Sequence, residues 1–357
     1  MKILHVLRGL ERTSGISAFL VENADRQACA GHDVALLYER IFEYRPIDKV
    51  RVSQGKSPFG IGFKPDVVHV HAVWSIFSIL AMFWCILKRT PFVVSPHGCL
   101  MPRVFKKGWL KKEFFYHIFV RPLMMKAFAI HVTAKLEAEA IKKLGFRQPV
   151  VIIPLGVEVV DFEKVKKASS MRTMLFVGRI GEEKGLVNLV RAWRQVDHAG
   201  WQLVIAGPDW KGYKDVLDKE IEQLSLVGDV LFPGSVVGEA KDKLYRNADC
   251  FVLPSPMENF SAVVLEALAH GLPVIATKGT PWGELEVCGC GWWIDQGVTP
   301  LADALRTVLQ KSADELIEMG RRGVQLTKSK YSWDIVADRT IDLYKRVVDA
   351  KSLSCQS

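Results

Sequence analysis

The chain has 357 residues, of which 49% are hydrophobic and 24% are charged. A chain of this length and composition can bury two cores of ordinary size, which predicts a two-domain globular protein and argues against disorder. The net charge of +9 is uneven, because residues 1–157 hold 23 Lys and Arg against 11 Asp and Glu, while the remainder holds 25 against 28. The first half is expected to meet an anionic partner such as phospholipid or nucleic acid, unless its cations merely lie in water.

The first residues predict a strand rather than a secretory leader, because the apolar run over residues 2–7 is short and is followed by polar residues. Residues 72–87 carry no charge but number only 16, fewer than the roughly 20 that span a bilayer. We expect a buried crossover helix there, with immersion in a membrane as the less favoured alternative.

Short runs rich in Val, Ile and Leu alternate with helical patterns along both halves of the chain. In the first half these runs are 2–7, 33–37, 67–70, 92–95, 129–133 and 150–153. In the second half they are 174–177, 202–206, 229–232, 250–253, 273–277 and 292–294. The alternation predicts an α/β protein with a doubly wound parallel sheet in each half. A linker is expected near 155–172, and an amphipathic helix over 333–348 ends the pattern.

The seven cysteines stand at positions 29, 85, 99, 250, 288, 290 and 355, mostly in apolar contexts. An odd, scattered set of this kind is typical of reduced thiols in a cytosolic protein. Cys288 and Cys290 have no second ligand pair at zinc spacing, so we expect no metal site there.

Two carboxylates, Glu258 and Glu266, flank an otherwise apolar stretch that begins a predicted helix. A buried carboxylate is costly unless a polar or cationic group meets it. Because the stretch follows the predicted strand 250–253, both carboxylates are expected at the carboxyl edge of the sheet, where open α/β sheets bind ligands. The alternative for Glu266 is a structural role, with its charge satisfied by backbone groups or by a lysine.

Two cations, Arg179 and Lys184, lie in the turn Gly178–Gly185 that follows the predicted strand 174–177. A guanidinium, an ammonium and a helix N-terminus together suit a diphosphate. Taken alone, the turn would be a surface loop with two solvated cations. The carboxylate of Glu258 at a neighbouring strand end favours a ligand-binding cleft instead.

A phosphorylated sugar donor requires this combination of groups. Cations would hold the diphosphate, and carboxylates would accept hydrogen bonds from the sugar and ribose hydroxyls. Asn259, Phe260 and Ser261 lie just before the predicted helix and would supply backbone N–H groups.

A histidine and a glycine mark the corresponding edge of the first sheet. His97 directly follows the predicted strand 92–95 and precedes Gly98. A lone histidine is usually structural, but this position favours one that faces a cleft between the domains. Gly15, in the turn after the first strand, is a weaker signal because the full glycine-rich fingerprint of dinucleotide binding is missing.

The segment from Arg103 to Lys126 is basic and aromatic. Its seven basic residues are Arg103, Lys106, Lys107, Lys111, Lys112, Arg121 and Lys126, against the single acid Glu113. They alternate with Trp109, Phe114, Phe115, Tyr116 and Phe119. The pattern favours a helix that lies on an anionic membrane surface over one that only covers its own domain. Nucleic acid is disfavoured because no recognition module accompanies the segment.

Taken together, these residues resemble the retaining glycosyltransferases of the GT-B fold, family 4, many of which assemble bacterial lipopolysaccharide, O-antigen and exopolysaccharide. The resemblance covers nearly the whole chain and rests on Ile153–Val157, Gly178–Arg179, Glu183–Gly185, Glu258–Phe260 and Glu266–Thr277. It implies two Rossmann-like domains that face each other across a cleft. Residues 1–157 with a C-terminal helix of about 335–357 would form the acceptor-side domain, and residues 158–334 the donor-binding domain.

The resemblance also implies roles for the candidate residues. Arg179 and Lys184 would bind the donor diphosphate, Glu266 the ribose and Glu258 the transferred sugar. Phe260 and Ser261 would offer backbone contacts. In this fold the base is also expected to meet backbone, here around Gly207 and the segment Phe232–Ser235, which includes Gly234. His97 resembles the family histidine near C6 of the sugar, and Gly15 the loop glycine near the phosphates or the acceptor. The usual Glu-Gly-Phe-Gly is here Glu258–Ser261, which adds a side chain beside the sugar.

The activity implied is transfer of a sugar, with retention of its anomeric configuration, from a nucleotide-sugar donor to a lipid-linked or saccharide acceptor. No Asp-x-Asp pair stands at a strand end, so the enzyme is expected to need no metal or other cofactor. A peripheral position on the inner face of the membrane is expected. Two alternatives stay open: a sugar-nucleotide epimerase of the same architecture, and a non-catalytic protein that binds anionic lipid.

Overall fold

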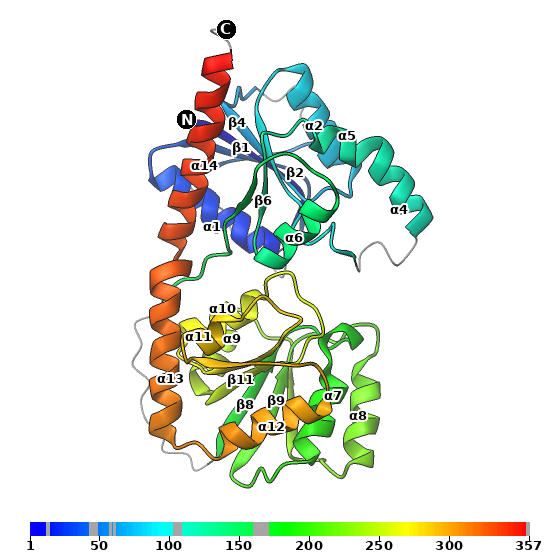
Figure 1. The fold of residues 1–357 in the computed structure, drawn as a ribbon, viewed down its shortest axis with the longest axis vertical. Coiled ribbons are helices and arrows are strands. Elements are labelled where there is room, and N and C mark those ends of the chain that lie inside the picture. Colours follow the sequence, from blue (N-terminus) through cyan, green and yellow to red (C-terminus); the bar gives the residue numbers. More distant parts are fainter. Residues whose placement is uncertain are drawn as a thin grey trace. The chain divides into compact units, whose positions relative to one another are not determined.

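The computed structural model describes residues 1–11, 15–42, 49–56, 59, 62–102, 109–159 and 171–354. The chain divides into two compact units, the first formed by residues 1–156 with 333–357 and the second by residues 157–332. Each unit is built on its own parallel sheet (Figure 1).

The first unit contains a parallel sheet of seven strands in the order β3-β2-β1-β4-β5-β6-β7. The strands are β1 (Lys2–Glu11), β2 (Asp33–Phe42), β3 (Arg51–Gln54), β4 (Val67–His71), β5 (Phe92–Ser95), β6 (Ala129–Val132) and β7 (Val150–Ile152). Every residue of β4, β5 and β6 is buried. Central strands of a parallel sheet are covered on both faces, which explains their apolar runs.

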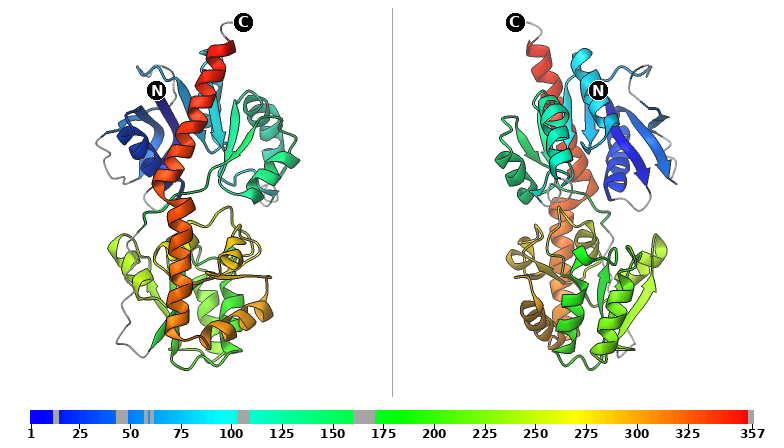
Figure 2. Two further views of the ribbon diagram at one scale, coloured as in Figure 1. Left: turned by 60° about the vertical axis from the view of Figure 1, so that its left-hand side comes forward. Right: turned by 90° about the vertical axis from the view of Figure 1, so that its right-hand side faces the viewer.

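Helices cover both faces of the first sheet. They are α1 (Gly15–Cys29), α2 (Ile76–Leu87), α4 (Trp109–Phe115), α5 (Arg121–Met124), α6 (Lys135–Lys143) and α14 (Trp333–Ser354), and a π-helical turn at Tyr116–Val120 joins α4 to α5. One core joins α2, α5 and α6 to one face of the sheet. The other core joins α1 and α14 to the opposite face, and Figure 2 shows α14 running along this unit.

The C-terminal helix is tied to the first unit by close packing at its start. A Cβ atom at Gly156 would lie 2.2 Å from the indole ring of Trp333, so only glycine fits there. Trp333, Val336, Tyr344 and Val347 all belong to the core beneath α1. The terminal segment of the chain therefore completes the core of the first unit.

The second unit contains a parallel sheet of six strands in the order β10-β9-β8-β11-β12-β13. The strands are β8 (Arg172–Val177), β9 (Trp201–Ala206), β10 (Val230–Gly234), β11 (Cys250–Leu253), β12 (Val274–Thr277) and β13 (Gly291–Ile294). The helices are α7 (Leu186–Arg194), α8 (Lys214–Gln223), α9 (Glu239–Asn247), α10 (Ala262–Ala269), α11 (Glu284–Val287), α12 (Val298–Leu309) and α13 (Ala313–Leu326). A 3-10 turn at Glu182–Lys184 precedes α7, and a π-helical turn at Thr327–Tyr331 follows α13.

The prediction of two doubly wound parallel sheets is confirmed, with two corrections. The sequence reading missed β3, a short edge strand with no apolar run and mostly exposed side chains. The helix expected over 72–87 begins at Ile76, and it is not fully buried: Ile76, Phe83 and Leu87 are exposed. These three residues lie on one face of α2, because their spacing of seven and four residues follows the helical repeat.

Candidate active site

The second sheet changes direction at the junction of β8 and β11. From β8 the chain winds outward to β9 and β10, and it then returns to add β11, β12 and β13 on the other side. The carboxyl ends of the strands at such a junction diverge into a crevice that binds ligands. The turn Gly178–Gly185 follows β8 and the segment Pro254–Ser261 follows β11, so both predicted halves of the site border this junction.

Glycines allow the loops at this edge to touch. Gly185 has a φ of +69°, and a Cβ atom there would lie 2.4 Å from the carbonyl oxygen of Pro254. Gly207 has a φ of +147°, and a Cβ atom there would lie 1.9 Å from the carbonyl oxygen of Gly178. A side chain would collide with backbone at both positions, so the loop that carries Lys184 is held against the loop that carries Glu258.

Lys184 and Glu258 meet directly. Their Nζ and Oε1 atoms lie 2.5 Å apart, and the two side chains are only 15% and 17% exposed. A charge pair this sheltered is weakly screened, and removal of either partner would leave the other charge uncompensated in a largely buried site. The structure therefore joins one predicted phosphate-binding cation to one predicted sugar-binding carboxylate.

Arg179 is more open to solvent than Lys184. Its side chain is 50% exposed, and its Nη2 atom lies 3.5 Å from Glu183. The guanidinium also lies over the indole ring of Trp210, 4.9 Å from the ring centroid. A planar aromatic support of this kind orients a guanidinium and leaves its N–H groups available to a phosphate.

Glu266 is already satisfied within the protein. Lys241 Nζ lies 2.7 Å from the carboxylate and the hydroxyl of Tyr245 donates to it at 2.8 Å. Burial, and then the charge of Glu266, raise the pKa of Tyr245 well above its usual value, so this hydroxyl remains a donor. The contact with Lys241 matches the structural alternative considered for Glu266.

Sequence reasoning missed both partners of Glu266. Lys241 and Tyr245 lie four residues apart in α9, which puts them on one face of that helix. The spacing is visible in the sequence, but nothing local indicates that this face lies against α10.

The turn before α10 carries the predicted backbone donors. Ser261 adopts a left-handed φ of +73° immediately before the helix. Its Oγ atom is buried and makes no hydrogen bond within the described part of the chain. The carbonyl of Phe260 accepts from the indole N–H of Trp282 at 2.6 Å, which fixes the backbone beside Asn259. A buried, unpaired hydroxyl at the start of a helix is consistent with a ligand that completes the site.

The two glycines predicted near the base lie together. The N–H of Gly207 donates to the carbonyl of Gly234 at 2.8 Å, at the ends of the paired strands β9 and β10. Gly234 has open space around its Cα, because a Cβ atom there would meet nothing within 4 Å.

In the first unit, His97 belongs to a group of five histidines. His5 lies on β1, His69 and His71 on β4, His97 directly after β5, and His131 on β6. The sequence reading singled out His97 alone. The alternation of His69 and His71 in an otherwise apolar strand was a visible signal, because a polar residue on a fully buried strand needs a partner.

Burial keeps these histidines neutral. It lowers the pKa of His5 to about 4, that of His131 to about 4 and that of His97 to about 3. It also lowers the pKa values of His69 and His71 well below the usual value, with further lowering from the neighbouring histidines.

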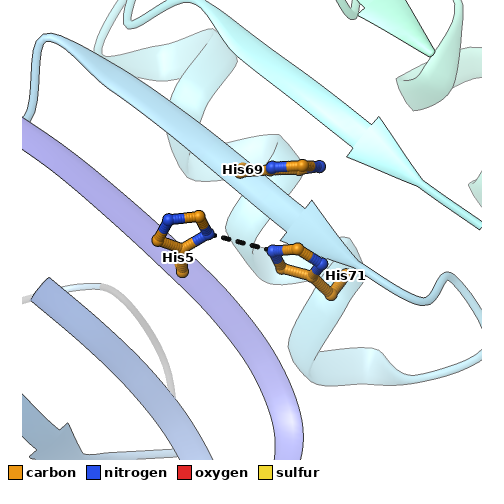
Figure 3. A group of neighbouring side chains, drawn as sticks. All are labelled: His5, His69 and His71. Atoms are coloured by element: carbon orange, nitrogen blue, oxygen red, sulfur yellow. Dashed lines mark hydrogen bonds between the residues drawn. The ribbon is translucent and has the colours of Figure 1, made fainter. Parts of the chain in front are cut away.

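Three of the histidines lie close enough together to suggest a metal site. Ligand atoms of His5, His69 and His71 lie within 4.8 Å of one another, and Figure 3 shows the rings gathered between β1 and β4. All six ring nitrogens of the three residues are nevertheless engaged in hydrogen bonds, including one between His5 and His71 at 3.0 Å. A metal ion would have to displace these bonds, so the hydrogen-bonded network accounts for the cluster without one.

Gly15 begins α1 and is exposed, and a Cβ atom there would meet nothing within 4 Å. Residues 12–14 lie outside the described residues.

The basic aromatic segment is described from residue 109 onward, and Arg103, Lys106 and Lys107 lie outside the described residues. Phe114, Ile118 and Phe119 are 65%, 49% and 43% exposed. Helix α5, which follows them, packs against α2, whose own apolar stripe is exposed. Among the described residues, no helix is long and apolar enough to cross a membrane.

Comparison with known proteins identifies the family. Residues 159–323 match the model of glycosyl transferases group 1, and residues 51–156 match that of a glycosyl transferase 4-like domain. The two models together cover most of the chain, which belongs to the group 1 glycosyltransferases.

Particular relatives fall within this class. The chain is 25% identical over 372 residues to the GDP-mannose:cellobiosyl-diphosphopolyprenol alpha-mannosyltransferase of Xanthomonas campestris, with 96% of each protein covered. It is 33% identical over 210 residues to an uncharacterized glycosyltransferase of Methanocaldococcus jannaschii, which covers 57% of this chain and 48% of that relative. Among solved structures, sucrose-phosphate synthase from Thermosynechococcus elongatus aligns with a TM-score of 0.80 at 17% identity, over 98% of this chain and 100% of that one. The architecture is that of the GT-B glycosyltransferases.

Proposed function

We propose that the protein transfers a sugar, with retention of its anomeric configuration, from a nucleotide-sugar donor to a lipid-linked or saccharide acceptor used in cell-surface polysaccharide synthesis. The observation that carries the proposal is the sheltered contact of Lys184 with Glu258 at the junction of β8 and β11. A cation and a carboxylate side by side suit the two parts of an activated sugar, since one part is an anion and the other is rich in hydroxyl groups.

Arg179 and Lys184 would stabilise negative charge on the departing nucleoside diphosphate. Both lie on the turn after β8, and Lys184 lies two residues before the start of α7 at Leu186, where backbone N–H groups add positive potential. Because two cations of the protein serve the diphosphate, the reaction is proposed to need no divalent metal, and transfer should persist when metal ions are chelated.

Glu258 would accept hydrogen bonds from hydroxyls of the transferred sugar. Its position beside Lys184 supports this role, because the sugar would then lie next to the bond that breaks. In the front-face route that retention requires, the sugar–phosphate bond breaks through an oxocarbenium-like state, the acceptor hydroxyl attacks the face that the leaving group vacates, and its proton passes to the donor phosphate.

A donor screen tests the proposal first. UDP-, GDP- and ADP-sugars are added to the protein, and a binder present at 100 times its dissociation constant should stabilise it by about 2.7 kcal/mol. The protein is then given the radiolabelled donor with a lipid-linked acceptor. Lys184→Ala should lower turnover by about 100-fold, as loss of one charge-stabilising donor typically does.

Lys311→Ala is the matched control, because Lys311 forms a surface pair with Glu315 at 3.1 Å in the same unit. Unchanged turnover in Lys184→Ala, or an equal loss in Lys311→Ala, would contradict the role of Lys184 in stabilising the diphosphate. Inversion of the anomeric centre in the product would contradict retention.

We further propose that the protein works at the cytoplasmic face of a membrane, held there by the first unit. The exposed apolar side chains of α2 and of residues 114–119 lie in the same unit as the exposed cations Lys88, Arg89 and Lys126, and Lys88 and Arg89 directly follow α2. Apolar side chains beside cations suit the interface of an anionic bilayer. The relative that acts on a diphosphopolyprenol-linked sugar supports an acceptor carried in a membrane.

Flotation with vesicles tests the membrane proposal. The wild type should bind vesicles that contain anionic lipid, and Phe114→Ser with Ile118→Ser should weaken binding by at least tenfold. Val287→Ser is the control, because Val287 is 86% exposed but lies in the second unit. Equal binding to neutral and anionic vesicles, or equal weakening in the control, would contradict the assigned surface.

A further inference from the structure

A row of hydrogen bonds runs from His97 into the interior of the first unit. His97 Nε2 lies 2.9 Å from His71 Nδ1, and His71 Nε2 lies 3.0 Å from His5 Nδ1. His5 Nε2 lies 2.8 Å from the side-chain oxygen of Gln27 on α1. In each of the three rings, Nε2 is therefore the nitrogen that points towards the interior of the unit.

The hydrogen bonds beyond Gln27 determine which atom donates in each bond of the row. The amide of Gln27 donates to Asn23 at 3.1 Å, the amide of Asn23 donates to Thr340 at 3.4 Å, and the hydroxyl of Thr340 donates to the carbonyl of Val336 at 2.8 Å. A backbone carbonyl only accepts, so the Thr340 hydroxyl is the donor to Val336 and must itself accept from Asn23. Each amide is thereby oriented, and the oxygen of Gln27 faces His5.

The orientation of Gln27 then determines which nitrogen donates in each of the three imidazoles. A neutral imidazole has one donor and one acceptor nitrogen, and burial keeps these rings neutral. His5 donates from Nε2 to Gln27, so its Nδ1 accepts from His71. His71 Nδ1 in turn accepts from His97. His97 thus carries its proton on Nε2 and presents a lone pair at Nδ1.

A second row is closed at both ends. The hydroxyl of Tyr344 lies 2.5 Å from His69 Nδ1, His69 Nε2 lies 2.6 Å from Ser95, and Ser95 lies 2.6 Å from His131 Nδ1. His131 Nε2 then donates to the carbonyl of Ile153 at 2.8 Å. In contrast, Nδ1 of His97 has no hydrogen-bond partner among the described residues, and His97, although mostly buried, keeps some exposure to solvent.

We propose that His71, His5 and Gln27 are positioning residues that fix His97 as a hydrogen-bond acceptor, so that it binds a hydroxyl group of the donor sugar and rejects a carboxylate or phosphate oxygen. The assignment of that hydroxyl to a donor sugar rests on the proposed function. A carboxylate or phosphate oxygen carries no proton, so it would face the lone pair of His97 Nδ1 without a hydrogen bond between the two atoms. A nucleotide-linked hexose should therefore bind about 10- to 100-fold more tightly than the matching hexuronate.

Nitrogen-15 NMR of the full chain, labelled at histidine and without ligand, reads the tautomer directly at neutral pH. The His97 signals, assigned by their loss in His97→Asn, should report a proton on Nε2. A proton on Nδ1, or an even mixture of tautomers, would overturn the inference without any use of a substrate.

Variants test the role of the row. Gln27→Met removes the acceptor that orients the row, so the His97 signals should move towards a mixture of tautomers and the preference for hexose should fall at least tenfold. Ser95→Ala, which removes the hydroxyl that joins His69 to His131 in the closed row, is the control and should leave the His97 tautomer unchanged. His71→Leu serves as a second variant if Gln27→Met fails to fold.

The binding measurements distinguish failure of this inference from failure of the proposed function. Equal affinity for hexose and hexuronate would overturn this inference while it leaves the proposed function intact. Failure of every nucleotide sugar to bind would overturn the proposed function, and the tautomer of His97 would still decide whether the row acts as inferred.

Discussion

The first unit holds five neutral histidines on and beside its sheet, joined in hydrogen-bonded rows, whereas the carboxyl edge of the second sheet holds lysines paired with carboxylates. The histidines of β1, β4 and β6 are at most 1% exposed, while the ionised pairs of the second unit keep contact with solvent. Full burial tolerates polar groups only when they are neutral and satisfied, and charge requires a partner and some water. The two sheets share a winding pattern, yet the polar groups beside them differ: buried neutral histidines in the first unit and paired charges in the second.

The largest predicted difference is in acid, which should destabilise the first unit more than the second. In the unfolded chain a histidine takes up a proton near pH 6.5, whereas the folded histidines resist protonation until about pH 4 for His5 and His131. The unfolded state therefore binds more protons between these values, so stability is full above pH 6.5 and falls as the pH is lowered. Each such histidine contributes up to about 1.4 kcal/mol per pH unit.

The expected result is a loss of several kcal/mol from the first unit between pH 7.5 and pH 5. Hydrogen exchange of the β1 and β4 amides measures it, and the β8 and β11 amides of the second unit serve as the internal reference. Equal acid sensitivity in both sheets would show that the buried histidines are not its source.

Two glycines, one in each unit, differ in the space around them and should respond differently to substitution. Gly207→Ala should destabilise the second unit by about 4 kcal/mol or more, because the new methyl group would collide with the carbonyl of Gly178 at an unfavourable φ. Gly15→Ala meets open space and should change stability by less than about 1 kcal/mol. Thermal unfolding measures both variants, and a similar loss in each would contradict the steric argument.

The sheltered ion pair should show energetic coupling. Lys184→Met and Glu258→Gln are each expected to destabilise the second unit, and the double variant should lose less than the sum, with a coupling energy of about 1–3 kcal/mol. The exposed pair of Lys345 with Asp342, at 3.4 Å, should couple by less than about 0.5 kcal/mol. Urea unfolding of both sets of variants measures the difference, and equal coupling would show that shelter does not strengthen the pair.

The smallest effect concerns Glu266. Tyr245→Phe removes one hydrogen bond to this carboxylate and should cost about 1 kcal/mol. Glu266→Gln is expected to cost a similar amount and, if the carboxylate also holds the ribose, to weaken nucleoside diphosphate binding beyond the effect of Tyr245→Phe. Calorimetry of the two variants distinguishes the roles: identical binding losses would assign Glu266 to structure alone.

The α/β class and the parallel winding of both sheets can be predicted from the amino-acid sequence alone, because buried parallel strands need uninterrupted runs of Val, Ile and Leu and crossover helices need an apolar face. The prediction missed β3, an edge strand whose side chains are mostly exposed and carry no such pattern. It also located Lys184 and Glu258 at neighbouring strand ends, because the carboxyl ends of parallel strands must meet along one edge.

The contacts between side chains of different elements could not be predicted in this way. The partners of Glu266 come from α9, and the row behind His97 draws on β1, β4, α1 and α14. Strand and helix patterns specify which face of an element is buried, but not which distant residue lies opposite it. Hydrogen bonds between residues as far apart in the chain as Asn23 and Thr340 depend on how whole elements pack, and that is settled only when the cores form.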